Sequence, residues 1–124
     1  MSQARIVTRS QAWMERAYAC VSRRQHSGTQ GDYLGFAKRF PSLIHTCGLA
    51  QALAFAEAKA PEGFVEDLNA VLAEPNLAAQ SRNAGLTEYL RLSRNALATA
   101  GWIKRYAEAL LEKDTKGAVD ASQS

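Results

Sequence analysis

The sequence is poor in cysteine, proline and β-branched residues, and each scarcity excludes a class of protein. Cys20 and Cys47 are the only cysteines and form no Cys-x-x-Cys pair, which excludes a disulfide scaffold. Many alanines and few β-branched residues favour helices over strands. The chain has no apolar run of about 18 residues, which excludes a membrane span, and residues 1–16 lack the uninterrupted apolar stretch typical of a signal peptide. We therefore expect an all-α cytoplasmic protein with no membrane partner.

Motifs that carry catalysis or cofactor binding are also missing. The chain has no glycine-rich dinucleotide fingerprint, no P-loop, no His-Glu-x-x-His and no Gly-x-Ser-x-Gly. His26 and His45, with the two cysteines, do not have metal-ligand spacing, because His45 and Cys47 point to different faces of a helix. The acids between residues 57 and 74 are spread at helical spacing rather than clustered. We expect no enzymatic activity, no cofactor and no metal.

The net charge of +3 conceals three blocks of different sign. Residues 1–50 hold seven Lys or Arg against two acids, residues 51–80 hold one against five, and residues 81–124 hold seven against five. This basic, acidic and basic order indicates one surface for an anionic partner and another for a different partner.

Hydrophobic spacing predicts a compact single-domain bundle of about six helices over residues 1–113, with a disordered polar tail at 114–124. The first helix is expected at residues 5–25, and glycines at 26–32 separate it from the second. Asp32 is the expected cap of the second helix. Phe40-Pro41 is expected to mark a boundary or a kink, with Pro41 in the first turn of a following helix. Further helices are expected from Leu49, after the Ala-Pro-Glu-Gly at 60–63, and briefly within 76–85.

The strongest helical pattern covers residues 86–113, a length of about 40 Å at 1.5 Å per residue. Thr87 is its expected N-cap. Gly101 costs roughly 1 kcal/mol relative to alanine in a helix, which indicates close packing or a slight bend. The expected apolar stripe consists of Leu86, Tyr89, Leu90, Leu97, Ala100, Ile103, Ala107, Leu110 and Leu111.

Arginines gather on two helix faces that lie away from the apolar stripes. On a helical wheel, four arginines of the first helix fall within about 40° of one another, and three of the last helix within about 60°. Guanidiniums at this spacing can follow phosphates and bind them in a bidentate manner, although the polar face of any basic helix looks similar. The two sets are Arg5, Arg9, Arg16 and Arg23, and Arg91, Arg94 and Arg105.

Trp102 falls among the arginines of the last helix rather than on its apolar stripe. A large aromatic side chain there either covers a second layer of the fold or meets a partner subunit. Stacking on a nucleic-acid base is a third possibility.

Two blocks of the sequence resemble a known family. Residues 40–55 (FPSLIHTCGLAQALAF) and residues 89–111 (YLRLSRNALATAGWIKRYAEALL) are similar to the small helical subunit of type III-B CRISPR effector complexes, the Cmr-type RNA-silencing machines. The segment AYACV at 17–21 fits the same family. Residues 60–85 match poorly, and Cys47 stands where the family usually has asparagine before Gly-Leu.

The resemblance implies an all-helical, non-catalytic subunit whose copies stack into a minor filament. These copies would lie beside the backbone subunits that hold the guide RNA and cleave the target, and would contact the large signature subunit at one end. Their basic surface would line the channel for the duplex of guide RNA and target RNA. The contacts that the resemblance implies are Lys38, Arg39, Arg91, Arg94, Lys104 and Arg105.

The geometry of the first helix adds candidates of its own. Arg16 and Arg23 join the predicted nucleic-acid contacts, whereas Arg5, Arg9 and Trp102 are predicted to meet a partner protein. The main hypothesis is a structural subunit whose arginines contact sugar-phosphate without reading bases. The alternative is a free-standing helical nucleic-acid-binding regulatory protein, which would need a recognition helix after a short turn.

Overall fold

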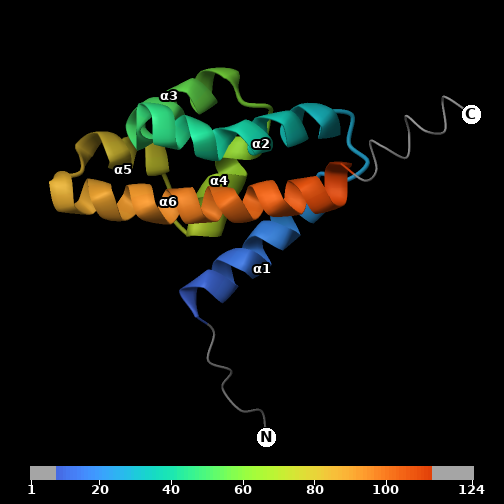
Figure 1. Ribbon diagram of the computed structural model, residues 1–124, viewed down its shortest axis with the longest axis horizontal. Helices are drawn as coiled ribbons and strands as arrows, with labels where there is room; N and C mark the ends of the chain where they lie inside the picture. Colours follow the sequence, from blue (N-terminus) through green and yellow to red (C-terminus); the bar gives the residue numbers. More distant parts are fainter. Residues whose placement is uncertain (1–7, 113–124) are drawn as a thin grey trace, which may run out of the picture.

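The computed structural model describes residues 8–112, which form six α-helices and a closing π-helical turn (Figure 1). The described residues contain no strand. The all-α class and the long last helix are therefore confirmed. The elements are α1 (Arg9–Ser22), α2 (Gln30–Cys47), α3 (Leu49–Lys59), α4 (Phe64–Leu72), α5 (Leu77–Asn83), α6 (Leu86–Ala107) and η1 (Glu108–Glu112).

Helix α6 runs the length of the molecule and organises the other helices around it (Figure 1). It packs against α2 and α1 and also against the shorter α4, while α3 packs on α2 and α5. The centre of the core is aromatic: the rings of Phe36 and Phe40 lie 4.9 and 5.2 Å from that of Phe64, both edge to face. Small residues of α6, Ala96 and Ala100, are buried and let its neighbours approach closely.

Helix α1 begins with a capping box. The Thr8 hydroxyl accepts a hydrogen bond from the Gln11 backbone N–H at 3.1 Å, and Gln11 Oε1 accepts one from the Thr8 N–H at 2.9 Å. The helix ends at Ser22, before the expected end at residue 25. Arg5 and the predicted tail at 114–124 lie outside the described residues.

The predicted boundary at Pro41 is wrong, because α2 continues through it to Cys47. Phe36 and Phe40 before the proline and Ile44 after it are all buried. Packing of these side chains outweighs the missing N–H, which costs a helix interior about 3 kcal/mol.

The prediction that Asp32 caps α2 is also wrong. The helix begins earlier because Gln30 is buried and bonded on both sides. Its Oε1 accepts from the His26 N–H at 2.7 Å, and its Nε2 donates to the Leu111 carbonyl at 3.0 Å. Asp32 lies instead in the first turn, where a negative charge favours the helix dipole.

The predicted apolar stripe of the last helix is only partly right. Ala100, Ile103 and Ala107 are buried, but Leu86 and Leu90 are 76% and 54% exposed. The buried face is rotated toward Leu92 and Ala96 and includes two polar residues, Asn95 and Thr99. Gly85, not Thr87, is the N-cap, and no atom lies within 4 Å of where a Gly101 Cβ would stand, so close packing does not explain that glycine.

Candidate nucleic-acid and partner-binding surfaces

Arg91 lies on the exposed side of α6, but acids of its own chain partly neutralise it. Its guanidinium donates two hydrogen bonds to the Glu88 carboxylate and lies 3.9 Å from Glu74. These hydrogen bonds lower the pKa of Glu88 below its ordinary value. Arg91 therefore offers an external anion less net charge than its position on the helix implies.

Arg94 and Arg105 are the more available charges of this face. Both are exposed, and Arg94 makes no ion pair with any residue between 8 and 112. The Arg105 guanidinium lies 5.1 Å from the centre of the Trp102 ring, a cation–π contact that fixes its position over the helix. Lys104 is half-buried beside it.

Trp102 itself packs against the hydrophobic core and stacks on Tyr106, with ring centres 6.0 Å apart at 22°. Tyr106 in turn meets the exposed Tyr18 of α1 edge to face at 5.4 Å. Trp102 and Tyr106 thus cover the joint between α1 and α6, and covering a layer of the fold was one of the three roles considered for Trp102. Contact with a partner remains a prediction.

The three described arginines of the first helix are held by their own chain. Arg16 Nε donates to the Val71 carbonyl at 2.9 Å and so ties α1 to α4. The Arg9 guanidinium lies 5.1 Å from the Trp13 ring, and Arg23 donates to the Cys20 Sγ at 3.4 Å. Arg9 and Arg23 remain exposed, whereas Arg16 is half-buried.

Lys38 and Arg39 project from different edges of α2. Lys38 Nζ lies 3.7 Å from the Glu112 carboxylate of η1, whereas the Arg39 guanidinium lies 5.9 Å from the Phe36 ring on the side of α3. The predicted contacts therefore do not form one continuous surface. Arg91, Arg94 and Arg105 share a face of α6, whereas Lys104 and the contacts of the other helices lie elsewhere on the molecule.

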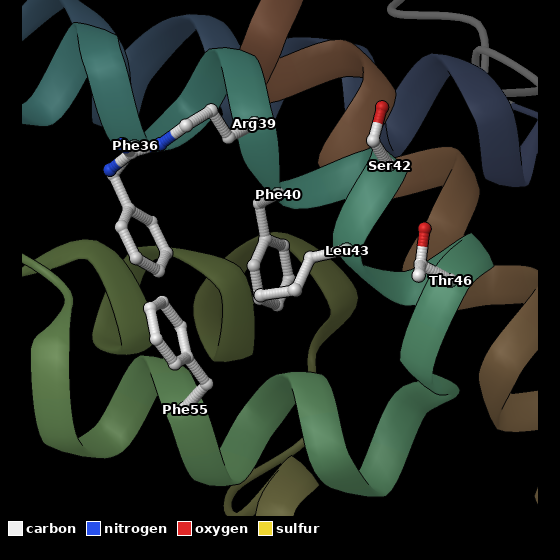
Figure 2. A pocket seen from close by; sticks show the side chains of 7 residues that line it. All are labelled: Phe36, Arg39, Phe40, Ser42, Leu43, Thr46 and Phe55. Carbon is white, nitrogen blue, oxygen red and sulfur yellow. The ribbon is translucent and has the colours of Figure 1, made fainter.

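An apolar groove of about 330 Å³ opens between α2 and α3 and was not anticipated from the sequence (Figure 2). The Phe36 and Phe55 rings approach each other across it, with centres 6.1 Å apart at 9°, and Phe55 is 46% exposed. A signal was available, since Phe55 is the one aromatic residue in an alanine-rich helix. We call this the aromatic groove; it is lined by Phe36, Arg39, Phe40, Ser42, Leu43, Thr46 and Phe55.

A buried ionic cluster joins the turn after α1 to α2 and α4 and was also missed. Arg24 donates to both carboxylate oxygens of Asp67 at 3.0 and 2.9 Å, and the Tyr33 hydroxyl donates to Asp67 Oδ2 at 2.6 Å. The Asp67 side chain is 4% exposed and that of Arg24 27%. Burial raises the pKa of Tyr33 well above its ordinary value, and the Asp67 carboxylate raises it further. We call Arg24, Tyr33 and Asp67 the ionic cluster.

The raised pKa of Tyr33 predicts a loss of stability in alkali. An unfolded chain releases this phenolic proton above pH about 10, while the folded chain retains it. The stability that the protonated Tyr33 hydroxyl contributes to the folded state is therefore complete below about pH 10 and is lost as the pH rises further. Chemical denaturation at increasing pH should show this loss in the wild type, and Tyr33→Phe should be less stable at neutral pH but lose less on going to alkali. Equal pH dependence of the two proteins would contradict the assignment.

Two further features of residues 8–112 concern metal binding and membranes. No group of three or more His, Cys, Asp or Glu there could hold a metal ion. None of the described helices combines the length and apolar character required to cross a membrane.

Comparison with known proteins identifies the family. The family model for CRISPR-associated protein (Cas_Cmr5) matches residues 9–110. The CRISPR system Cmr subunit Cmr5 of Thermus thermophilus is 40% identical over 112 residues, which cover 86% of this chain and 98% of that protein. The crystal structure of a CRISPR-associated Cmr5 family protein from Thermus thermophilus has a TM-score of 0.82 at 39% identity and covers 86% of this chain and 99% of that one. The chain therefore belongs to the Cmr5 family of CRISPR-associated proteins.

Proposed function

We propose that the chain is a structural, non-catalytic subunit of a type III-B CRISPR effector ribonucleoprotein. The observation that carries this proposal is the 40% identity, over almost the whole length of both proteins, to a protein named as a Cmr subunit. Its partners would be the guide and target RNA, the backbone and large subunits, and neighbouring copies of itself in a minor filament.

The exposed face of α6 is the best-supported RNA-binding surface. Arg94 and Arg105 are both exposed and lie about 16 Å apart along the helix at 1.5 Å per residue. Arginines at this distance can contact two separate phosphates of a duplex without reading its bases. Arg91 contributes less because Glu88 and Glu74 share its charge.

The remaining basic residues are proposed as secondary contacts. Lys38, Arg39 and Lys104 come from the blocks that match the family, and Arg16 and Arg23 from the geometry of α1. Arg9 and Trp102 remain proposed contacts to a partner protein. Arg16 is the weakest candidate, since its Nε is already bonded to the Val71 carbonyl.

Purification of a tagged copy from its host tests membership of the complex. The tagged chain should bring down guide RNA and several larger subunits in fixed proportion. A chain recovered alone would contradict the proposal, and sequence-preferring binding to duplex DNA would favour a free-standing regulator instead.

Charge reversal tests the RNA surface. Arg94→Glu and Arg105→Glu, made singly, should each weaken binding of a guide–target duplex uniformly across sequences and reduce the log–log salt slope by about one. The control is Arg82→Glu on α5, an exposed arginine outside the α6 face that lies 3.9 Å from Glu57. Circular dichroism should show unchanged helicity in all three proteins. An unchanged salt slope in both α6 variants would remove this face from the RNA-binding surface.

A further inference from the structure

The aromatic groove is an apolar surface that the fold leaves open. Phe40 and Phe36 are buried at its floor, while Leu43 is half-buried and Phe55 nearly half exposed (Figure 2). Water in contact with such a surface is released when another apolar group covers it. The groove therefore has the chemistry of a docking site for aliphatic side chains.

The same chain also exposes an aliphatic ridge. Leu86 and Leu90 lie one turn apart on α6 and are the two most exposed of its large hydrophobic side chains within the described residues. Both come from the expected apolar stripe, yet neither faces the core of its own molecule. We call this pair the leucine ridge.

We propose that the leucine ridge of one copy docks into the aromatic groove of the next copy. This inference rests on the proposed function, since it assigns surfaces to the contact between stacked copies. The ridge and the groove are different surfaces, so the contact is heterologous and can repeat into an open chain rather than close as a two-fold dimer.

Residue spacing gives the contact a register. Leu86, Leu90 and Arg94 follow one another at four-residue steps on α6, and Asp32, Phe36 and Phe40 do so on α2, each step about 6 Å. Rows at this spacing are the ridges by which helices pack. With the two helices antiparallel, Leu86 meets Phe40 and Leu90 meets Phe36.

The charges agree with this register. When the leucines are so placed, Arg94 of one copy lies opposite Asp32 of the next, so that within a stack Arg105 rather than Arg94 would be left for RNA. Both side chains are exposed, and neither makes an ion pair within residues 8–112. The parallel alternative would place Arg94 beyond Phe40, away from Asp32.

Neither leucine of the ridge lines the groove of its own chain, so the proposed contact is one between molecules. Lys38 on one edge of α2 reaches Glu112, directly after α6, whereas the edge that carries Phe36 and Leu43 faces α3. Helix α2 therefore presents the groove on a different side from the one that meets the end of its own α6.

Disulfide trapping of the full chain tests the contact without RNA. Leu43→Cys with Leu86→Cys, in a Cys47→Ser background, should oxidise to a ladder of dimers, trimers and longer chains on a non-reducing gel. The control pairs Leu86→Cys with Ala58→Cys, an exposed position of α3 outside the groove, and should form no ladder. Absence of the ladder in the first protein, or an equal ladder in the control, would overturn the proposal.

A charge swap tests the register. Asp32→Arg places two arginines opposite each other and should weaken association at least about tenfold in sedimentation velocity. Adding Arg94→Asp to the same chain should restore it. Failure of the swap to restore association would overturn the register and with it the proposal. Co-purification with guide RNA is measured separately. A chain that enters the complex without forming the ladder would therefore refute the contact between ridge and groove but not the proposed function.

Discussion

Arg24→Met is expected to lower the free energy of unfolding by about 3 kcal/mol, the lower end of the range for breaking a buried ion pair. The substitution leaves the Asp67 carboxylate, 4% exposed, without its cation while the Tyr33 hydroxyl remains its only donor in the ionic cluster. The lower end of that range applies because the Arg24 side chain is 27% exposed, so that solvent partly screens its attraction to Asp67. Urea denaturation followed by circular dichroism measures the loss.

The double variant Arg24→Met with Asp67→Asn separates the charge from the packing. The asparagine removes the unpaired charge but keeps an oxygen that can accept from Tyr33, so about 2 of the 3 kcal/mol should return. Lys38→Met is the matched control, because the Lys38–Glu112 pair is exposed and should contribute less than about 1 kcal/mol. Equal losses for Arg24→Met and Lys38→Met would show that burial of the cluster has no energetic consequence.

The ionic cluster could have been predicted from the sequence. On the wheel of the helix expected at residues 5–25, Arg24 falls within the apolar stripe rather than on the arginine face, about 20° from Ala17. Asp67 likewise lies among Phe64, Leu68 and Val71 on the buried face of α4. A cation and an anion on two apolar faces indicate a buried pair. The exposed arginines, by contrast, indicate contacts with external partners.

Periodicity predicted the helices but not their ends. The spacing of apolar residues placed α1, α3, α4 and α6 where the structure has them, because an amphipathic face must be buried. Helix ends depend on tertiary contacts, such as the Gln30 bond to the Leu111 carbonyl that starts α2 early. Pro41 shows the same limit, since buried neighbours on both sides override a local helix breaker.

The sequence predicted which arginines of the candidate surface are exposed, but not which acids of the same chain pair with them. The wheel correctly placed Arg94 and Arg105 away from the core. It could not show that Arg91 pairs with Glu74, because that acid belongs to the loop after α4 and only the fold brings them together. The exposure of Leu86 and Leu90 was missed for a related reason: an apolar stripe shows which face is hydrophobic but not whether its own molecule covers it.

Gly63→Ala is expected to cost about 2 to 4 kcal/mol, because two separate penalties meet at this glycine. Gly63 has φ +91°, and alanine in left-handed backbone costs about 1 to 2 kcal/mol. The added Cβ would also overlap the guanidinium of Arg24, which donates to the Gly63 carbonyl at 3.4 Å. Moving that guanidinium lengthens its bonds to Asp67, and the loss is measured by denaturant unfolding.

A double-mutant cycle separates the two penalties. In an Arg24→Met background the overlap with the guanidinium is gone, so Gly63→Ala should cost only the backbone part, about 1 to 2 kcal/mol. Gly101→Ala is the control for adding a methyl group where space is open, and it should stabilise α6 by about 1 kcal/mol. An equal cost of Gly63→Ala in both backgrounds would show that Arg24 does not require a glycine beside it. A smaller cost in the Arg24→Met background would mean that Gly63 has two roles. It allows the left-handed backbone of the turn before α4, and it leaves the space that the Arg24 guanidinium needs to bind Asp67.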